Sequence, residues 1–417
     1  MVLYIYKMEI FMDLQNILEE QNRLLNNITL DKKRYLYEKI NWNLKSIGIL
    51  GQRGLGKTTM MLQYIKEHYP DSDKALYISL DNPYFQATSL LEFAKEFEMN
   101  GGEVLFIDEV HKYNDWSTHI KKIYDILELK VVFSGSSILQ ITKQNADLSR
   151  RTIIYYLENL SFREYLFLQD IATFKSYSLE ELLLNHSMIA SEISKKIKPI
   201  KFFKEYLEFG AYPFILEDKE SYHQRIIQII NLILESDLPH ITRIEMQQIQ
   251  KLKKLLYLLA INVPFIPNIK DLAESTNISR PKLYEYLNEL ENAKIINSIR
   301  SQEKGYSLMS KPEKLFMQNT NISHALTSKV DIGSAREAFF VNQIKNYYAS
   351  QNLFINEAIY ASKKGDFLVN TIYTFEVGGK NKGFKQIKDM ENSYVAADDI
   401  EFGHGNKIPL WLFGFLY

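Results

Sequence analysis

The most constraining feature of this sequence is a glycine-rich loop that ends in lysine and threonine. Residues 51–58, Gly-Gln-Arg-Gly-Leu-Gly-Lys-Thr, match the complete phosphate-binding pattern Gly-x-x-x-x-Gly-Lys-Thr. An apolar run at 47–50 precedes it, and residues 58–65 have the apolar spacing of a helix. A strand, a glycine loop and a helix in this order surround a phosphate with backbone N–H groups. The alternative, a chance glycine-rich turn, does not account for the flanking elements.

The loop predicts a site for ATP and Mg²⁺. Its glycines permit positive φ and a close approach of the backbone to the anion. Lys57 is expected to reach the β- and γ-phosphates, and the Thr58 hydroxyl is expected to join the shell of a Mg²⁺ ion. The expected nucleotide-binding residues are Gly51, Gln52, Arg53, Gly54, Leu55, Gly56, Lys57, Thr58 and Thr59.

A second motif is an apolar run that ends in two acidic residues, Asp108 and Glu109. The near-continuous apolar run at 104–107 is typical of a parallel strand that is covered on both faces. Acidic residues at the carboxyl end of such a strand are expected beside the phosphate loop. We expect Asp108 to hold the Mg²⁺ ion through water and Glu109 to orient or deprotonate the attacking water.

Two more strand candidates indicate the type of P-loop protein. One, at 75–80, lies in the sequence between the loop and the acidic strand, and a glutamate follows the aspartate. This combination is typical of ATPases that carry their own catalytic glutamate. The other candidate leads from Lys130 into Ser134-Gly135-Ser136-Ser137. Ser134 is the first candidate, and Ser136 the second, for contact with the γ-phosphate or the attacking water; a serine-rich turn without such a role is the alternative.

With these motifs and the run Leu160-Ser161-Phe162-Arg163-Glu164-Tyr165, the chain resembles prokaryotic AAA-type ATPases of the archaeal-ATPase-like group, over about residues 30 to 417. The resemblance implies an α/β fold with a P-loop core and a parallel sheet. A helical and winged-helix region would follow, and then a C-terminal α/β domain of the restriction-endonuclease-like, PD-(D/E)xK type. The expected segments are helical 1–45, ATPase 46–160, helical 161–260, winged helix-turn-helix 261–305 and nuclease-like 306–417.

In ATPases of this kind, an arginine near the end of the core often reaches a γ-phosphate in its own or a neighbouring subunit. Arg150 and Arg151 are the candidates here. A role in a neighbouring subunit would imply a homo-oligomer. A surface salt bridge is the alternative for either residue.

Residues 262–300 predict a helix-turn-helix followed by the first strand of a wing. Ser279 suits the N-cap of the second helix and Pro281 its first turn. In a DNA-binding protein, the residues that face the groove would be Ser279, Arg280, Lys282 and Tyr284. The same helix carries Glu285, Glu289 and Glu291, which oppose phosphate binding. A protein contact or a nucleotide lid is therefore the alternative to contact with DNA.

Three acidic residues near the C-terminus predict a tentative second metal site: Glu337 on a helix, and Asp366 and Glu376 on a hairpin. Oxygen ligands of this kind suit Mg²⁺. Nucleases of the resembled fold carry a lysine two residues after the second acid, where this chain has Gly378. The first lysine beyond that position is Lys380. Either Lys380 bends back into the site or the site is inactive. Gln386, expected on the following helix, resembles a glutamine seen in relatives of this fold.

Composition limits the remaining choices. The chain has 417 residues, no cysteine, and 50 Lys+Arg against 51 Asp+Glu. Disulfides and thiolate metal sites are excluded, which suits a cytoplasmic protein, and no global field favours nucleic acid. No segment approaches the roughly 20 apolar residues that span a bilayer, so we expect no membrane partner. The apolar run 408–417 predicts a buried strand.

Two functional hypotheses follow. In the first, the chain hydrolyses ATP and couples the turnover to binding or cleavage of DNA or RNA by its C-terminal domain. In the second, it is a nucleotide-dependent switch or scaffold whose winged helix and inactive nuclease-like domain bind protein partners. Stimulation of the ATPase by DNA favours the first hypothesis, and insensitivity to DNA favours the second.

Overall fold

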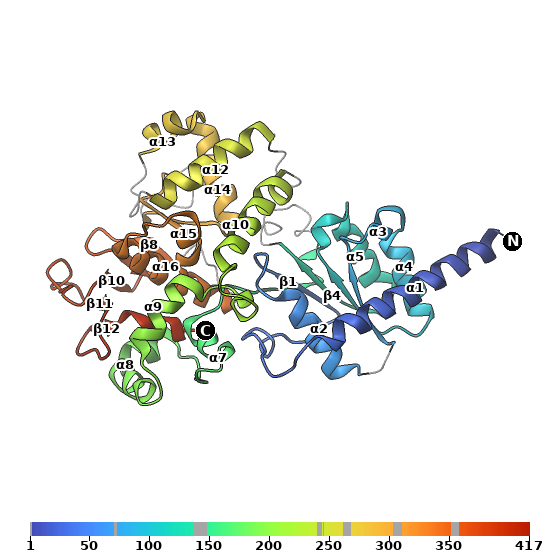
Figure 1. The fold of residues 1–417 in the computed structure, drawn as a ribbon, viewed down its shortest axis with the longest axis horizontal. Coiled ribbons are helices and arrows are strands. Elements are labelled where there is room, and N and C mark those ends of the chain that lie inside the picture. The colour runs from blue at the N-terminus through green and yellow to red at the C-terminus, as the bar shows by residue number, and fades with distance from the viewer. Residues whose placement is uncertain are drawn as a thin grey trace. The chain divides into compact units, whose positions relative to one another are not determined.

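The protein forms two compact units, residues 1–157 and 158–417. The computed structural model describes residues 2–70, 73–136, 148–239, 244, 246–261, 268–302, 311–351 and 358–417. The three segments expected after residue 160 therefore belong to one compact unit. Each unit contains its own five-stranded sheet (Figure 1).

The first unit is a parallel α/β sheet with helices around it (Figure 1). Strands β1 to β4 are fully or largely buried, as their apolar runs predict, whereas β5 at the edge is partly exposed. In chain order the elements are α1 (Val2–Asn26), β1 (Ser46–Leu50), α2 (Lys57–His68), β2 (Ala75–Ser79), α3 (Tyr84–Ala87), α4 (Leu90–Met99), β3 (Val104–Asp108), η1 (Val110–Lys112), α5 (Trp116–Ile126), β4 (Lys130–Gly135) and β5 (Ile153–Tyr156).

The strand order is β2-β3-β4-β1-β5, and all neighbours are parallel. The strand that separates the loop strand β1 from the acidic strand β3 is β4, whereas β2 lies at the edge. The β1–β2 and β3–β4 connections run in opposite directions across the sheet, so their helices α2 and α5 cover opposite faces. The carboxyl ends of β1, β3 and β4 consequently meet at one edge.

Helix α1 protects the edge strand β2. Gln21 of α1 donates to the carbonyl of Ala75 at 3.1 Å and accepts from the amide of Tyr77 at 2.5 Å. A side-chain amide thus pairs with backbone groups that an edge strand otherwise leaves open. The N-terminal segment is in this way part of the first unit.

The second unit begins with helices, as expected for residues 161–260, and ends in a mixed sheet (Figure 1). The helical part contains α7 (Phe162–Leu168), α8 (Leu179–Ser194), α9 (Pro199–Phe209), η3 (Pro213–Leu216), α10 (Tyr222–Leu232), η4 (Ile233–Asp237) and α12 (Met246–Ile261). Next come α13 (Ile269–Thr276), α14 (Arg280–Asn292) and a hairpin of β6 (Ile296–Ile299) and β7 (Lys314–Met317), which pair antiparallel.

Helix α16 (Ile332–Ser350) packs against the C-terminal sheet after the short α15 (Thr320–Leu326). The sheet has the order β12-β11-β10-β9-β8. Strands β8 to β10 are antiparallel, and β10 to β12 are parallel. The bounds are β8 (Ile359–Ala361), β9 (Phe367–Val369), β10 (Tyr373–Gly378), β11 (Ser393–Ala397) and β12 (Lys407–Pro409).

Two expectations for the C-terminal part were wrong. The run 408–417 is not one strand, because β12 ends at Pro409 and Leu410–Phe415 form the 3-10 helix η7. Proline cannot donate to a strand ladder, and apolar character alone does not separate a buried strand from a buried helical turn. The helix expected around Gln386 is also not formed; residues 385–389 are turns, and Gln386 is exposed.

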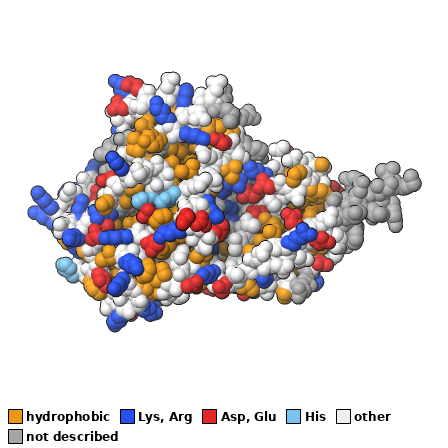
Figure 2. Space-filling view, in the orientation of Figure 1, with side chains coloured by type: hydrophobic (Ala, Val, Ile, Leu, Met, Phe, Trp, Pro, Cys, Tyr) orange, Lys and Arg blue, Asp and Glu red, His pale blue; other side chains and the backbone are white. Residues whose placement is uncertain are grey.

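The surface carries charges of both signs. Lys and Arg side chains are interspersed with Asp and Glu over the face that Figure 2 shows. Within the described ranges, no helix has the length and apolar character needed to cross a membrane.

Candidate functional site

The phosphate loop has the backbone conformation that its glycines predict. Gly54 and Gly56 have φ of 79° and 90°, in the region that favours glycine. Gly51 serves close packing instead, since a Cβ atom there would lie 2.4 Å from the carbonyl oxygen of Leu157. Arg34, from the segment before β1, donates to the carbonyl of Leu55 and supports the loop from outside.

Lys57 begins helix α2 and turns back over the loop. Its ammonium group donates to the carbonyls of Gly51 at 2.9 Å and Gln52 at 3.0 Å, and the residue is 5% exposed. An ammonium group has three donors and no acceptor. The loop carbonyls therefore hold this cation beside the loop backbone.

Asp108, at the end of β3, collects hydroxyl groups from three other elements. Thr58 of α2 donates to its Oδ2 at 2.6 Å, and Tyr77 of β2 donates to the same oxygen at 2.9 Å. Ser134 of β4 donates to Oδ1, which also accepts from the amide of Glu109 at 3.1 Å. The parallel sheet thus brings together the two residues expected to serve Mg²⁺, Thr58 and Asp108. Sequence reasoning missed Tyr77, which carries no motif.

Ser134 faces Asp108 rather than open space. Its side chain is 0% exposed, and its hydroxyl donates to the carboxylate. This geometry fits a serine that orients Asp108 better than one that touches a phosphate. The second candidate, Ser136, is 3% exposed just beyond β4. Ser137 lies outside the described residues.

Glu109 is held in a left-handed backbone conformation with φ of 56° and ψ of 42°. This region is uncommon for residues other than glycine and costs roughly 1 kcal/mol or more. Its Oε2 lies 3.2 Å from Nη2 of Arg53 and 3.1 Å from Nε2 of His111. The same Arg53 and His111 nitrogens are 3.3 Å apart. The carboxylate is consequently directed at a side chain of the phosphate loop.

The two arginines after β4 differ in their surroundings. Arg151 makes a two-pronged ion pair with Asp125, with Nε–Oδ1 at 2.7 Å and Nη2–Oδ2 at 3.0 Å. The guanidinium holds the pKa of Asp125 below its usual value. Arg150 is exposed. The salt-bridge alternative therefore describes Arg151, and Arg150 is the better candidate for a contact in another subunit.

The three acidic residues predicted near the C-terminus lie together, linked by two lysines. We call Glu337, Asp366 and Glu376 the acidic cluster. Lys314 of β7 donates to Glu337 Oε2 at 2.7 Å and to Asp366 Oδ1 at 3.2 Å. Lys382 forms an ion pair with Glu376 and lies 3.6 Å from Asp366 Oδ2. In this arrangement, no three carboxylate or imidazole groups in the described part of the chain converge closely enough to hold one metal ion.

Burial and the lysines set the pKa values of the acidic cluster. Burial raises the pKa of Glu337 against the opposing charge of Lys314. Burial also raises the pKa of Glu376, where the hydrogen bond from Lys382 opposes it and the nearby charge of Asp366 adds to it. For Asp366, burial acts upward, but the ammonium groups and the Val377 amide outweigh it, so its pKa is lowered. The carboxyl group with the most positively charged and amide neighbours, Asp366, is thus the one that stays ionised most readily.

The expectation for Lys380 was wrong. Lys380 is exposed, and its carbonyl accepts a hydrogen bond from Nζ of Lys407. Lys382 instead reaches the acidic cluster by passing over Gly378, where an added Cβ would lie 2.9 Å from its Cβ, Cγ and Cδ atoms. Glycine at 378 therefore leaves room for a lysine that arrives from four residues further along. A side chain introduced at 378 would displace Lys382.

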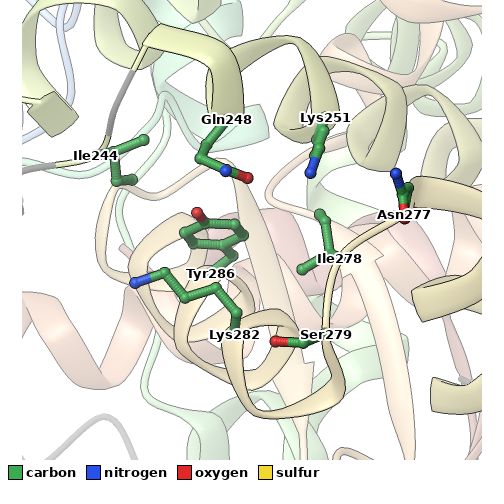
Figure 3. A pocket seen from close by; sticks show the side chains of 8 residues that line it. All are labelled: Ile244, Gln248, Lys251, Asn277, Ile278, Ser279, Lys282 and Tyr286. Carbon is green, nitrogen blue, oxygen red and sulfur yellow. The ribbon is translucent and has the colours of Figure 1, made fainter.

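A pocket of about 260 Å³ lies between α12 and the start of α14 (Figure 3). Two residues expected to face a DNA groove, Ser279 and Lys282, line it together with Lys251 and Gln248 of α12. Lys282 is already engaged by Glu285, with Nζ–O distances of 2.8 and 2.9 Å. This ion pair offsets much of the charge that Lys282 would offer to a phosphate.

The comparison with known families finds a match for most of the first unit. Residues 43–166 match the model of the AAA domain, and residues 200–332 match a domain of unknown function (DUF8612). The AAA match spans the parallel sheet, the phosphate loop and the acidic strand. The chain therefore contains an AAA-type P-loop domain.

Similarity to individual proteins adds little about function. An uncharacterized protein of Methanocaldococcus jannaschii is 26% identical over 424 residues, covering 92% of this chain and 88% of that protein. AMPPCP-bound DnaA from Aquifex aeolicus is 18% identical, with 65% of this chain and 91% of that chain covered and a TM-score of 0.26. DnaA bound to AMPPCP and single-stranded DNA is 13% identical, with coverages of 62% and 86% and a TM-score of 0.25. TM-scores this low carry no inference about this chain.

Proposed function

We propose that the AAA-type domain binds ATP with Mg²⁺ and hydrolyses it. The observation that carries this proposal is the meeting of Thr58 and Ser134 on the Asp108 carboxylate, beside the lysine-covered loop. Three separate elements contribute. Helix α2 supplies the Lys57 cation for the phosphates, Thr58 of α2 and Asp108 of β3 supply oxygen atoms for Mg²⁺, and Ser134 of β4 orients Asp108. A phosphate-binding loop with a purely structural role does not require this convergence.

The loop residues have distinct roles in this proposal. Backbone N–H groups of residues 51–59 and the ammonium group of Lys57 bind the phosphates. Thr58 and Asp108 would hold Mg²⁺, which when bound offsets phosphate charge. Ser134 and Tyr77 orient the Asp108 carboxylate, as outer hydrogen bonds generally do for metal-binding side chains.

Glu109 acts as the general base in this proposal. It would orient the attacking water and accept its proton. In the structure, Oε2 of Glu109 lies beside Arg53 and His111, and its backbone is strained. We propose that Arg53 directs the Glu109 carboxylate toward the phosphate loop, where the attacking water would bind.

The proposal is tested by Mg-ATP turnover of Glu109→Gln. The amide keeps the size of the side chain but cannot accept a proton, so turnover should fall by about 10²-fold or more while affinity for ATP is retained. Glu103→Gln is the matched control, because Glu103 precedes β3 at the opposite end and its side chain is 50% exposed. Wild-type turnover in Glu109→Gln would remove the assigned role. Binding without turnover by the wild-type protein would favour a nucleotide-dependent switch.

We propose as a second function that residues 158–417 act on nucleic acid. The order α13, α14 and the β6–β7 hairpin supports a winged helix-turn-helix, and the acidic cluster with Lys382 supports a restriction-endonuclease-like centre. These carboxylates would hold a divalent cation, which when bound lowers the pKa of a water and offsets phosphate charge. Lys382 would take the role that the sequence predicted for Lys380.

This second proposal is tested by incubating DNA and RNA with the protein and Mn²⁺. Cleavage by the wild-type protein that is lost in Asp366→Ala supports a nuclease, and a rise in ATP turnover on addition of DNA supports coupling. If DNA does not change the ATP turnover and is not cleaved, the switch or scaffold hypothesis takes precedence. The engagement of Lys282 by Glu285 is the observation that favours this alternative.

A further inference from the structure

The histidine that follows the proposed base is buried beside it. His111 lies in η1, the 3-10 turn that begins directly after Glu109. Its side chain is 1% exposed, so the surrounding protein limits the rotation of the ring. Arg53, the other neighbour of Glu109, has a long side chain that starts from the phosphate loop and is 14% exposed. His111 is thus the more rigidly placed of the two neighbours.

The contact between His111 and Arg53 assigns the hydrogen of the imidazole ring. Nη2 of Arg53 and Nε2 of His111 form a hydrogen bond of 3.3 Å. A guanidinium group has donors and no acceptor, so Arg53 donates and Nε2 accepts. An accepting ring nitrogen carries no hydrogen, and in a neutral imidazole the hydrogen then lies on Nδ1. His111 therefore presents a lone pair to the arginine of the phosphate loop.

This hydrogen bond leaves an oxygen of Glu109 available. Oε2 lies 3.2 Å from Nη2 of Arg53 and 3.1 Å from Nε2 of His111. The oxygen is buried and has no aligned hydrogen bond within the described residues. The charge of Arg53 attracts the carboxylate, while the aligned hydrogen of the guanidinium goes to the imidazole. Oε2 consequently keeps a lone pair for a hydrogen of the attacking water.

We infer that His111 is a positioning residue for ATP hydrolysis, which acts by holding Arg53. The inference rests on the first proposed function and gives a role to a residue that neither nucleotide motif covers. Without an acceptor at this place, the guanidinium is able to turn fully onto Glu109. Arginine and a carboxylate would then form the paired hydrogen bonds that they prefer. Those bonds would occupy the oxygen that has to accept the proton of the water.

The inference is tested by Mg-ATP turnover of two variants of the full chain. His111→Phe keeps a flat ring and has no acceptor, whereas His111→Gln carries an amide oxygen that can replace Nε2. We expect kcat to fall by about 10-fold or more in His111→Phe, because the base is misdirected, while the Kd for a fluorescent ATP analogue changes little. His111→Gln should retain most of the turnover. If His111→Phe does not fold, His111→Asn replaces it, since its shorter side chain does not bring an acceptor to the position of Nε2.

His68→Phe is the matched control. His68 lies at the opposite end of α2 from the phosphate loop, and a phenyl ring can keep its stacking on Tyr64. This variant should have wild-type kcat. A fall in kcat of His111→Gln equal to that of His111→Phe would contradict the inference, because the loss would then follow from packing and not from the acceptor.

A role that acts through Arg53 also predicts that two substitutions do not add. In an Arg53→Gln background, His111→Phe should cause no further fall in kcat, whereas independent effects would multiply. Multiplied effects overturn the inference. If Glu109→Gln stops turnover and His111→Phe has wild-type kcat, the inference is wrong and the proposed function stands. Wild-type turnover in Glu109→Gln would instead remove the proposed base.

A second readout does not depend on turnover. Nitrogen NMR of the nucleotide-free protein with labelled histidine separates ring nitrogens that carry a hydrogen from those that do not. The chain has 8 histidines, and the signals that are missing in His111→Gln identify His111. At pH 8 we expect Nε2 of His111 without a hydrogen, and Arg53→Gln should shift this signal. A hydrogen on Nε2 and none on Nδ1, or a signal that Arg53→Gln leaves unchanged, overturns the inference.

Discussion

Nη2 of Arg53 lies 3.2 Å from Oε2 of Glu109, so an ion pair joins the phosphate loop to the residue that follows β3. Arg53 is a variable position of the loop motif, and Glu109 is the proposed base. The pair is largely shielded, with side-chain exposures of 14% and 15%. A shielded pair of this kind ties the position of the base to the state of the loop.

Arg53→Gln should therefore affect turnover more than nucleotide affinity. Without the guanidinium, the strained Glu109 loses the partner that directs it, and we expect kcat to fall on the order of 10-fold. The Kd for a fluorescent ATP analogue should change much less. Arg53→Lys should retain part of the activity. Lys95→Gln is the control, because it removes the exposed Lys95–Glu92 ion pair on α4. A loss confined to affinity would instead assign Arg53 to phosphate binding.

Lys57→Ala is expected to abolish ATP binding. The substitution removes a charge-assisted contact to the phosphates that the loop amides cannot replace. Thermal unfolding measures this directly, because stabilisation by a ligand follows its affinity. Mg-ATP should stabilise the wild-type protein and Lys95→Ala, and leave Lys57→Ala unchanged. An equal gain in all three proteins would mean that the nucleotide binds elsewhere.

Ser134→Ala is expected to weaken the Mg²⁺ dependence of turnover. The hydroxyl orients Asp108, and loss of such an outer hydrogen bond typically costs roughly 10- to 100-fold in metal affinity. The Mg²⁺ concentration at half-maximal turnover should rise accordingly, with less change at saturating Mg²⁺. Ser46→Ala is the matched control. Ser46 lies at the start of β1, and its hydroxyl forms a 2.7 Å hydrogen bond with the hydroxyl of Thr152. A fall in turnover that excess Mg²⁺ does not restore would instead support a contact with the phosphate or the water.

Substitution of Arg150 is expected to lower turnover, whereas substitution of Arg151 is expected to lower stability. If Arg150 reaches a neighbouring active site, Arg150→Ala should cut turnover by about 10³-fold or more with little change in ATP affinity. Its activity should return in mixed assemblies with Glu109→Gln, since each variant supplies what the other lacks. Arg151→Ala should keep its turnover and lose stability at neutral pH only, because the ionised Asp125 that it pairs with is protonated in acid. Near-normal turnover in both variants would leave structural roles alone.

Glu289 is expected to make stability fall as pH rises toward neutrality. Burial, with a contribution from the charge of Glu285, raises its pKa to about 7, and its Oε2 has no hydrogen-bond partner among the described residues. Between about pH 4.5 and 7, the folded protein keeps a proton that the unfolded chain has lost, so the free energy of unfolding decreases with pH. Glu289→Gln should remove this decrease and stabilise the protein at pH 8 by on the order of 2 kcal/mol. Urea unfolding at pH 5 and 8 measures it, with the exposed Glu274→Gln as control; equal slopes in both variants would contradict the prediction.

The parts of the fold that depend on neighbouring residues were predictable from the sequence. Glycines at 54 and 56 adopt the positive φ that the loop motif requires, because that conformation depends on the absence of a side chain. The strand that ends at Asp108 and the hairpin that follows Asp366 were likewise expected from apolar runs and their acidic ends. The C-terminal run was not, because an apolar pattern reports burial and Pro409 decides where the strand ends.

Pairings between distant segments were decided only by the tertiary structure. The sequence placed three acids in one cluster, but spacing along the chain favoured Lys380, whereas the turn after β10 brings Lys382 over Gly378. Lys314 pairs with two acids that lie 23 and 52 residues further along the chain. Arg53 pairs with Glu109, and two strands lie between them in the sequence. Such contacts depend on how sheets and hairpins pack, and that packing leaves no local pattern in a single sequence. The sequence by itself therefore determined which chemical groups are present and where the loop forms, and the packing of the elements decided which charges face one another.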